Sequence, residues 1–132
     1  MKYVYTAVFT IENEHTVYAR IPDLPGCITT GKDLNDALLQ VTDAASIWLI
    51  SAEDNDDDIP APTPQETIRR ENGQLLSLIS IDTILYRSLN DTRAVRKNVS
   101  LPLWMVNLAS KRGINCSKVL QQSLQSIFSN SQ

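Results

Sequence analysis

Residues 3–31, YVYTAVFTIENEHTVYARIPDLPGCITTG, contain three segments that are typical of neighbouring β-strands. Residues 3–11 are rich in aromatic and β-branched residues on both alternating faces and contain no breaker, which predicts a strand at the centre of a sheet. Residues 16–21 alternate apolar and polar side chains, as a half-buried hairpin partner does. Residues 22–26 have turn chemistry, and residues 27–30 can form a short third strand. The stretch therefore predicts three consecutive strands.

An amphipathic helix is expected directly after these strands. Asp33 is suited to be its N-cap. The apolar residues that follow recur at helical spacing, and they are Leu34, Ala37, Leu38, Val41, Ala44, Ala45, Trp48 and Leu49. This face should cover one side of the sheet, with the tryptophan in the core. Residues 74–83 (QLLSLISIDT) predict a fourth strand, so the N-terminal body has the order β-β-β-α-β.

The segment between this helix and the fourth strand combines an acidic run with regularly spaced prolines. Residues 53–58 read EDNDDD, and residues 59–64 read IPAPTP. Prolines at every second position forbid a helix and favour an extended path. The acidic run lacks the Gly and terminal Glu spacing of an EF-hand loop. Two interpretations stay open for Asp56, Asp57 and Asp58: a solvated loop, or a patch that steers a basic partner electrostatically.

The last forty residues or so follow a different pattern. Residues 93–101 (RAVRKNVSL) alternate and end at Pro102, which suits the first turn of a helix. That helix is expected to reach Arg112, with Gly113 as its C-cap, and Asn115 can N-cap a second helix with an apolar stripe. A strand and two helices of this size are too small to bury a core alone. The simplest remedy is a homodimer in which two such strands pair antiparallel about a twofold axis.

Charge is divided unequally between these two parts. The 132 residues have a net charge of −3 and 42% apolar residues, as a folded chain has. Residues 1–90 hold six Lys/Arg and fourteen Asp/Glu, a net −8, whereas residues 91–132 hold six Lys/Arg and one Asp, a net +5. A basic end suggests nucleic acid, and an acidic body suggests another partner. We expect no membrane span and no signal peptide, and hence a cytoplasmic protein. Cys27 and Cys116 form no CxxC pair, so no zinc or other metal site and no cofactor is expected.

Residues 95–102, followed by residues 113–117, resemble the ribbon-helix-helix DNA-binding module, in which paired strands enter the major groove. The side chains expected to read bases lie on one face of the predicted strand, and they are Arg96, Asn98 and Ser100. Backbone N–H groups at the start of the second helix can bind a DNA phosphate, at Asn115, Cys116 and Ser117. The residues expected in the dimer core are Val99, Leu101, Val106, Val119, Leu120 and Leu124. Lys97 departs from the pattern, since an apolar residue is more usual there, and a dimerisation ribbon without a DNA role stays an alternative.

The body is similar to the N-terminal domain of HicB-type antitoxins. The likeness rests on residues 5–9 (YTAVF), 21–27 (IPDLPGC), 30–33 (TGKD) and 59–64 (IPAPTP), together with the predicted helix. It implies an α+β chain made of a partial ribonuclease-H-like body (residues 1–83), a connector (84–92) and the ribbon-helix-helix module (93–132). It also implies that the body binds and occludes a small basic HicA-like toxin that cleaves mRNA, while the tail binds operator DNA as an autorepressor. Because bodies could pair as well as tails, assembly beyond the homodimer stays open.

Catalysis by the body itself is not expected. Ribonuclease-H chemistry needs several carboxylates on neighbouring strands to hold two Mg²⁺ ions, whereas residues 3–11 contain none and Asp82 stands alone. His15, the one histidine, lies in a polar turn, and no nucleophile–base pair is visible. The alternative function is a ligand-sensing ribbon-helix-helix transcriptional repressor, although the sequence carries no clear signature of a ligand pocket.

Overall fold

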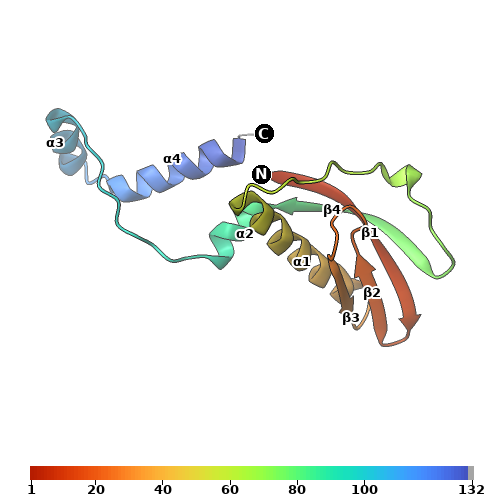
Figure 1. Ribbon diagram of the computed structural model, residues 1–132. Helices are drawn as coiled ribbons and strands as arrows, with labels where there is room; N and C mark the ends of the chain where they lie inside the picture. The colour runs from red at the N-terminus through yellow and green to blue at the C-terminus, as the bar shows by residue number, and fades with distance from the viewer. Residues whose placement is uncertain (131–132) are drawn as a thin grey trace. The chain divides into compact units, whose positions relative to one another are not determined.

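The computed structural model describes residues 1–130, which divide into two compact units, Lys2–Thr83 and the chain from Ile84 onward (Figure 1). The first unit is a four-stranded antiparallel sheet with one long helix on one of its faces. The second unit consists of helices joined by segments without regular secondary structure. None of the helices within residues 1–130 is long and apolar enough to cross a membrane.

The sheet confirms the strands that the sequence predicts. They are β1 (Lys2–Asn13), β2 (Thr16–Arg20), β3 (Ile28–Gly31) and β4 (Gln74–Asp82). Their order is β3-β2-β1-β4, and every neighbouring pair is antiparallel. β1 is central, and side chains are buried on both of its faces: Tyr5, Ala7 and Phe9 on one, Val8 and the polar Thr6 on the other.

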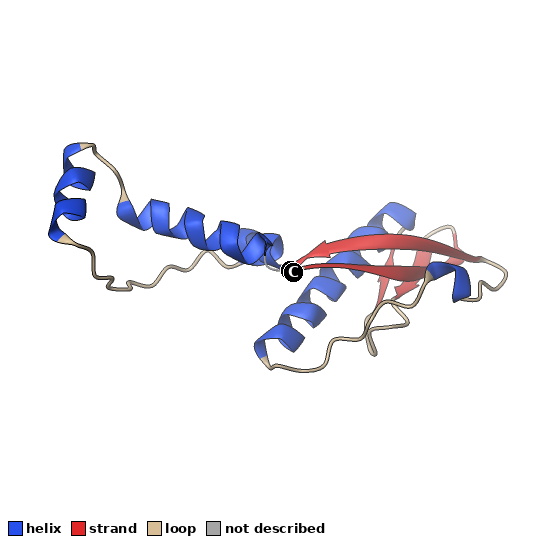
Figure 2. Cartoon of the chain, turned by 90° about the horizontal axis from the view of Figure 1, so that it is seen from above, coloured by secondary structure: helices blue, strands red, loops and turns tan. Residues whose placement is uncertain are grey.

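The long helix α1 (Leu34–Asp54) covers one face of this sheet (Figure 2). Asp33 is its N-cap as predicted, since the Asp33 carboxylate accepts a hydrogen bond from the N–H of Asp36 at 2.8 Å. The buried apolar side of α1 is formed by Ala37, Val41, Ala45, Leu49 and Ala52. Trp48 packs against the edge of this core, and its indole N–H donates to the carbonyl of Pro25 at 3.0 Å.

α1 ends in a C-terminal capping turn that was not predicted from the sequence. Asp56 has a φ of 54°, a left-handed conformation that Asp adopts more readily than most residues. The N–H of Asp57 then donates to the carbonyl of Ala52 at 2.9 Å, as in a Schellman motif. Asp56, within the acidic run, therefore has a structural role in ending the helix.

The proline-spaced segment is extended, as predicted, and is anchored by a side chain of β1 and one from the loop between β2 and β3. The Tyr5 hydroxyl donates to the carbonyl of Pro60 at 2.6 Å. The Asp23 carboxylate accepts hydrogen bonds from the N–H and hydroxyl of Thr63 at 2.8 and 2.6 Å. Burial and the nearby charge of Asp23 raise the pKa of Tyr5 above its usual value. A short 3₁₀ turn, η1 (Gln65–Thr67), follows before β4.

A polar junction joins the ends of three elements. The Glu53 carboxylate, at the end of α1, accepts hydrogen bonds from the Tyr3 hydroxyl at 2.7 Å and the Thr83 hydroxyl at 3.0 Å. Tyr3 belongs to β1, and the fully buried Thr83 begins the next helix, α2 (Thr83–Asn90). Glu53 therefore forms part of the packing of the unit, whereas the sequence reading placed it in a solvated acidic run.

The C-terminal unit contains the two helices predicted for the tail, α3 (Leu103–Lys111) and α4 (Cys116–Asn130). The connector predicted over residues 84–92 is mostly the helix α2. The strand predicted over residues 93–101 is absent from this single chain. Residues 91–102 have no regular secondary structure (Figure 1). A strand exists only when a partner satisfies its backbone groups, and the single chain supplies none for this segment.

Candidate functional site

The turn between α3 and α4 is built by local backbone chemistry, as the sequence predicts. Gly113 has a φ of 66°, and the N–H of Ile114 donates to the carbonyl of Ala109 at 2.9 Å, which completes a Schellman cap on α3. Asn115 caps α4, since its side-chain oxygen accepts a hydrogen bond from the N–H of Lys118 at 3.1 Å. The start of α4 is therefore held in a defined orientation relative to the end of α3.

Three basic side chains surround this turn. Lys111 and Arg112 end α3, and Lys118 lies in the first turn of α4. Cys116 and Ser117, predicted to contact phosphate, form the beginning of α4 and are exposed. A helix N-terminus carries partial positive charge, and the basic side chains add to it, so this end of the unit is suited to attract an anion.

The three residues predicted to read bases lie on the segment before α3. Arg96, Asn98 and Ser100 are exposed, but they share a face only if the segment is a strand. The single chain does not form that strand, so the structure leaves their common face a prediction. Arg93, at the beginning of the segment, pairs with Asp91 at 2.9 Å, and this hydrogen bond lowers the pKa of the exposed Asp91 carboxyl.

The apolar side chains of the tail have no core of their own. None of the residues from 84 to 130 is buried. The predicted dimer-core residues are all exposed in the single chain: Val99, Leu101, Val106, Val119, Leu120 and Leu124. Ile127 and Phe128, which belong to the apolar stripe predicted for the second helix, are exposed as well. The structure adds further exposed apolar residues that were not predicted as core, which are Leu103, Trp104, Met105, Leu108 and Ile114. So many exposed apolar side chains on a unit of this size are typical of a surface that binds a partner.

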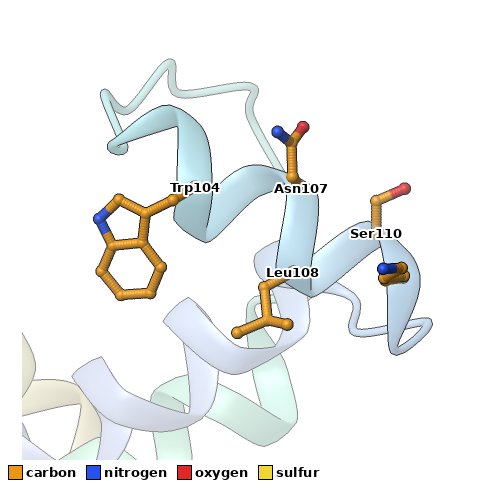
Figure 3. A pocket seen from close by; sticks show the side chains of 5 residues that line it. Trp104, Asn107, Leu108 and Ser110 are labelled. Carbon is orange, nitrogen blue, oxygen red and sulfur yellow. The ribbon is translucent and has the colours of Figure 1, made fainter.

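One part of this surface is a shallow hollow on α3. It is lined by Trp104, Asn107, Leu108, Ser110 and Lys111 (Figure 3). Trp104 is 64% exposed, although tryptophan usually buries most of its ring. The signal that could have found this surface is the run LWMV at residues 103–106, which is too apolar for an exposed helix start.

The acidic residues after α1 lie at an electrostatically unfavourable place. Asp56, Asp57 and Asp58 are exposed at the C-terminus of α1, where the helix dipole favours positive charge, and the last turn of α1 has no basic residue. Their charge therefore does not stabilise the helix. Among residues 1–130, no group of three or more His, Cys, Asp or Glu side chains is placed to hold a metal ion.

The two cysteines are in different environments. Cys27 is buried in the core of the sheet unit, and this burial raises the pKa of its thiol. Cys116 is exposed at the start of α4, and both are free thiols. The structure therefore contains no disulfide between them.

Comparison with known proteins covers both units. The family model described as "HicB_like antitoxin of bacterial toxin-antitoxin system" matches residues 5–122. The chain belongs to the HicB-like antitoxin family. The match begins within β1 and ends within α4, so it includes the sheet unit and most of the helical tail of this HicB-like antitoxin.

Relatives of known structure share the fold of this HicB-like chain. A toxin-antitoxin complex from Streptococcus pneumoniae contains a chain with a TM-score of 0.56 and 20% identity, over 96% of this chain and 99% of that one. The antitoxin HicB of Burkholderia pseudomallei has a TM-score of 0.54 and 18% identity, over 98% of both chains. A HicA3–HicB3 toxin-antitoxin complex matches with a TM-score of 0.50 and 20% identity, over 61% of this chain and 99% of that one.

A sequence relative matches only part of the HicB-like chain. UPF0150 protein Ta0767 of Thermoplasma acidophilum is 29% identical over 62 residues, which is 47% of this chain and 90% of the relative. The relative is thus matched almost in full by about half of this antitoxin.

Proposed function

We propose that this HicB-like antitoxin neutralises a HicA-like toxin that cleaves mRNA, by binding it with the sheet unit so that RNA cannot reach it. The family match over residues 5–122 is the observation that carries this proposal. Inhibition by occlusion needs no catalytic group in the antitoxin, and it depends on the affinity of the complex. The ribonuclease-H-like character of the sheet unit stays a prediction.

We further propose that the tail, residues 93–132, is a ribbon-helix-helix module that forms a homodimer. Two observations support it: no residue from 84 to 130 is buried, and residues 91–102 lack a strand partner. A second copy of the tail would pair with residues 91–102 and would also cover the apolar faces of α3 and α4. The dimer then represses the operon that encodes it.

The charge of the tail supports DNA as its ligand. Residues 91–132 carry a net +5, and three of their basic side chains surround the start of α4. Phosphate contacts give affinity that falls as salt rises, and strand side chains in the major groove give sequence preference. In the dimer, Arg96, Asn98 and Ser100 would reach the groove twice, once from each strand.

Copurification tests the antitoxin assignment directly. The full chain is expressed together with the protein encoded by the adjacent gene, and the mass of the purified assembly is measured. We expect a stable complex in which RNA cleavage by the small partner is suppressed. Two results would contradict this function: no complex, or metal-dependent cleavage of RNA by the antitoxin chain alone.

The replacement Asn98→Ala should weaken operator binding by about 1–3 kcal/mol, because one base contact is lost from each strand. Toxin neutralisation should be unchanged, since Asn98 lies outside the sheet unit. A mobility-shift assay with the promoter fragment at fixed salt measures the first effect, and rescue of growth in cells expressing the toxin measures the second. Asn35→Ala, an exposed asparagine of α1, is the matched control and should leave operator affinity unchanged. Equal operator affinity of Asn98→Ala and wild type would contradict the base-reading role.

Replacing Asp56, Asp57 and Asp58 together with asparagine should slow association with a cationic toxin and flatten its salt dependence. These charges oppose the dipole of α1, so their removal should not destabilise the helix, and asparagine tolerates the left-handed conformation of Asp56. The expected loss is about tenfold in the association rate at low salt. Stopped-flow measurement against Glu12, Glu14 and Glu71 replaced together with glutamine, an equal change of charge elsewhere, distinguishes a local effect from net charge. An unchanged rate would remove the steering role.

A further inference from the structure

The two edges of the sheet differ in how well they are protected. β3, at one edge, has four residues and ends at Gly31, which lies against Ala37 of α1. β4, at the other edge, has nine residues and pairs only with β1, in a register that is regular over all nine. Residues 74–81 contain no charged residue, no Pro and no Gly. β4 therefore lacks the features with which natural edge strands avoid pairing with another chain.

Hydrogen bonding with β1 decides which backbone groups of β4 point outward. The N–H of Ile11 donates to the carbonyl of Gly73, its opposite residue in the same register, at 3.0 Å. Bonded and non-bonded pairs alternate along an antiparallel ladder, so the odd-numbered residues of β4 direct their N–H and C=O groups to β1. The backbone groups that point to the outer edge therefore belong to Leu76, Leu78 and Ser80.

The middle of this outer edge is apolar and exposed. Leu78, at the centre of β4, is 59% exposed, and it lies on the face of the sheet opposite α1, because its neighbour Ile79 belongs to the core beneath the helix. The Ser77 hydroxyl donates to the Leu78 carbonyl at 3.2 Å, which leaves the second lone pair of that carbonyl for another donor. A hollow borders the strand, and its lining includes Ile68 and Leu76 as well as Leu78. An edge of this kind is suited to receive another strand.

The strand that fits this edge is β4 of a second copy. Antiparallel pairing about a twofold axis at Leu78 places Leu78 opposite itself in a hydrogen-bonded pair and Leu76 opposite Ser80. Outward backbone groups then meet outward backbone groups along the ladder. Asp82 lies opposite Gln74, so no charge faces a like charge. This matters because residues 1–90 carry a net −8, and two such units repel each other wherever charged surfaces meet.

We propose that two sheet units pair edge to edge through β4 and form one continuous sheet within the tail homodimer. The proposal rests on that homodimer, which is itself proposed above. A contact confined to one pair of strands is smaller than the roughly 1,200 Å² of a stable interface, so it does not hold two free chains together. The tail dimer tethers both sheet units through residues 84–92, which raises the effective concentration of each β4 for the other. The pairing also removes an edge that could add further chains.

A disulfide across the twofold axis tests this pairing in the full chain carrying Cys116→Ser, so that the buried Cys27 is the one native thiol left. Leu78→Cys should form an interchain disulfide on oxidation with diamide, since opposite Cα atoms of a bonded pair lie about 5.5 Å apart, within the disulfide range. Ser80→Cys is the matched control: it is exposed on the same face, but its two copies lie about 13 Å apart along the ladder and should not cross-link. Combining Leu76→Cys with Ser80→Cys should restore the cross-link, because these two positions are opposite.

Three measurements accompany the cross-linking. Electrophoresis without reductant gives the cross-linked fraction, and sedimentation gives the oligomeric state of the reduced chain. Adding Leu101→Asp, which removes the tail dimer, to Leu78→Cys should slow cross-linking at least about tenfold at micromolar concentration, because the tether is lost. Urea unfolding of reduced Leu78→Cys confirms that the variant is folded, as expected for a largely exposed position.

The outcomes separate this pairing from the homodimer on which it rests. If the reduced wild-type chain sediments as a monomer, the tail homodimer falls and the pairing of sheet units falls with it. If it sediments as a dimer and Leu78→Cys does not cross-link, the pairing through β4 is wrong and the tail homodimer stands. Equal cross-linking of Leu78→Cys and Ser80→Cys would also overturn the pairing, since random collision would explain it. Undiminished cross-linking with Leu101→Asp would overturn the role of the tether.

Discussion

Replacing Gly31 with alanine should lower the free energy of unfolding of the sheet unit by about 3 kcal/mol, at the upper end of what overpacking usually costs. A Cβ atom at Gly31 would lie 2.3 Å from the backbone N and 2.6 Å from the Cα of Ala37. Both atoms belong to the first turns of α1, and a backbone cannot rotate aside as a side chain can. To admit the methyl group, α1 must move away from β3, which opens the core beneath it.

Urea unfolding of the full chain, followed by circular dichroism, measures this loss. Thr30→Ala, at the preceding exposed position of β3, is the control and should change stability by less than about 1 kcal/mol. The transition should shift to lower urea with an unchanged slope, because the surface exposed on unfolding is the same. Wild-type stability of Gly31→Ala would contradict the close approach of β3 and α1.

The sequence predicts the sheet unit well where the signal lies within one element. Apolar residues on both faces of residues 3–11 predicted the central strand, and β1 does lie between β2 and β4. Asp33, Gly113 and Asn115 were predicted as caps, and each makes the cap geometry expected of it. A cap involves a residue and its neighbours three or four positions away, so a short window of sequence contains all of the information.

Other features of the structure were not predicted, because they depend on residues that are distant in the sequence or on the conformation of the folded chain. Gly31 gave no signal that α1 would approach it, because the contact with Ala37 exists only once the helix folds back on β3. The left-handed conformation of Asp56 was hidden within a run that reads as a solvated loop. Leu34 and Leu38 were predicted on the face that covers the sheet, but they are 39% and 38% exposed, because helical spacing alone does not show where the sheet beneath the helix ends.

In the tail, the sequence pattern predicts a strand whose pairing partner is not part of the single chain. Alternation over residues 93–101 predicts a strand, and the structure of the single chain has none there. In the proposed homodimer, the edge that pairs with this segment belongs to the second copy, which also covers the exposed apolar residues of α3 and α4. The strand is therefore a prediction about the proposed dimer, and the oligomeric state tests it.

Leu101→Asp should convert the homodimer to a monomer and abolish operator binding. In the proposed dimer Leu101 faces the helices, and an uncompensated carboxylate buried there costs about 3–5 kcal/mol at each of two equivalent sites. The dimer dissociation constant should therefore rise by about 10⁴-fold or more. Operator binding is lost with it, because one strand alone offers half of the base contacts. Sedimentation of the full antitoxin chain gives the oligomeric state, and a mobility-shift assay gives operator affinity.

Ser100→Asp provides the sharpest control, since it adds the same charge one residue away on the opposite face of the proposed strand. It should remain a dimer, because its carboxylate stays in solvent, and it should still lose operator affinity, because that carboxylate meets the DNA phosphates. The pair of variants thus separates the two faces: loss of DNA binding is common to both, and loss of the dimer is specific to Leu101→Asp. If Leu101→Asp remained a dimer and Ser100→Asp became a monomer, the faces would be exchanged, and the bases would be read by Val99 and its neighbours on the alternate positions.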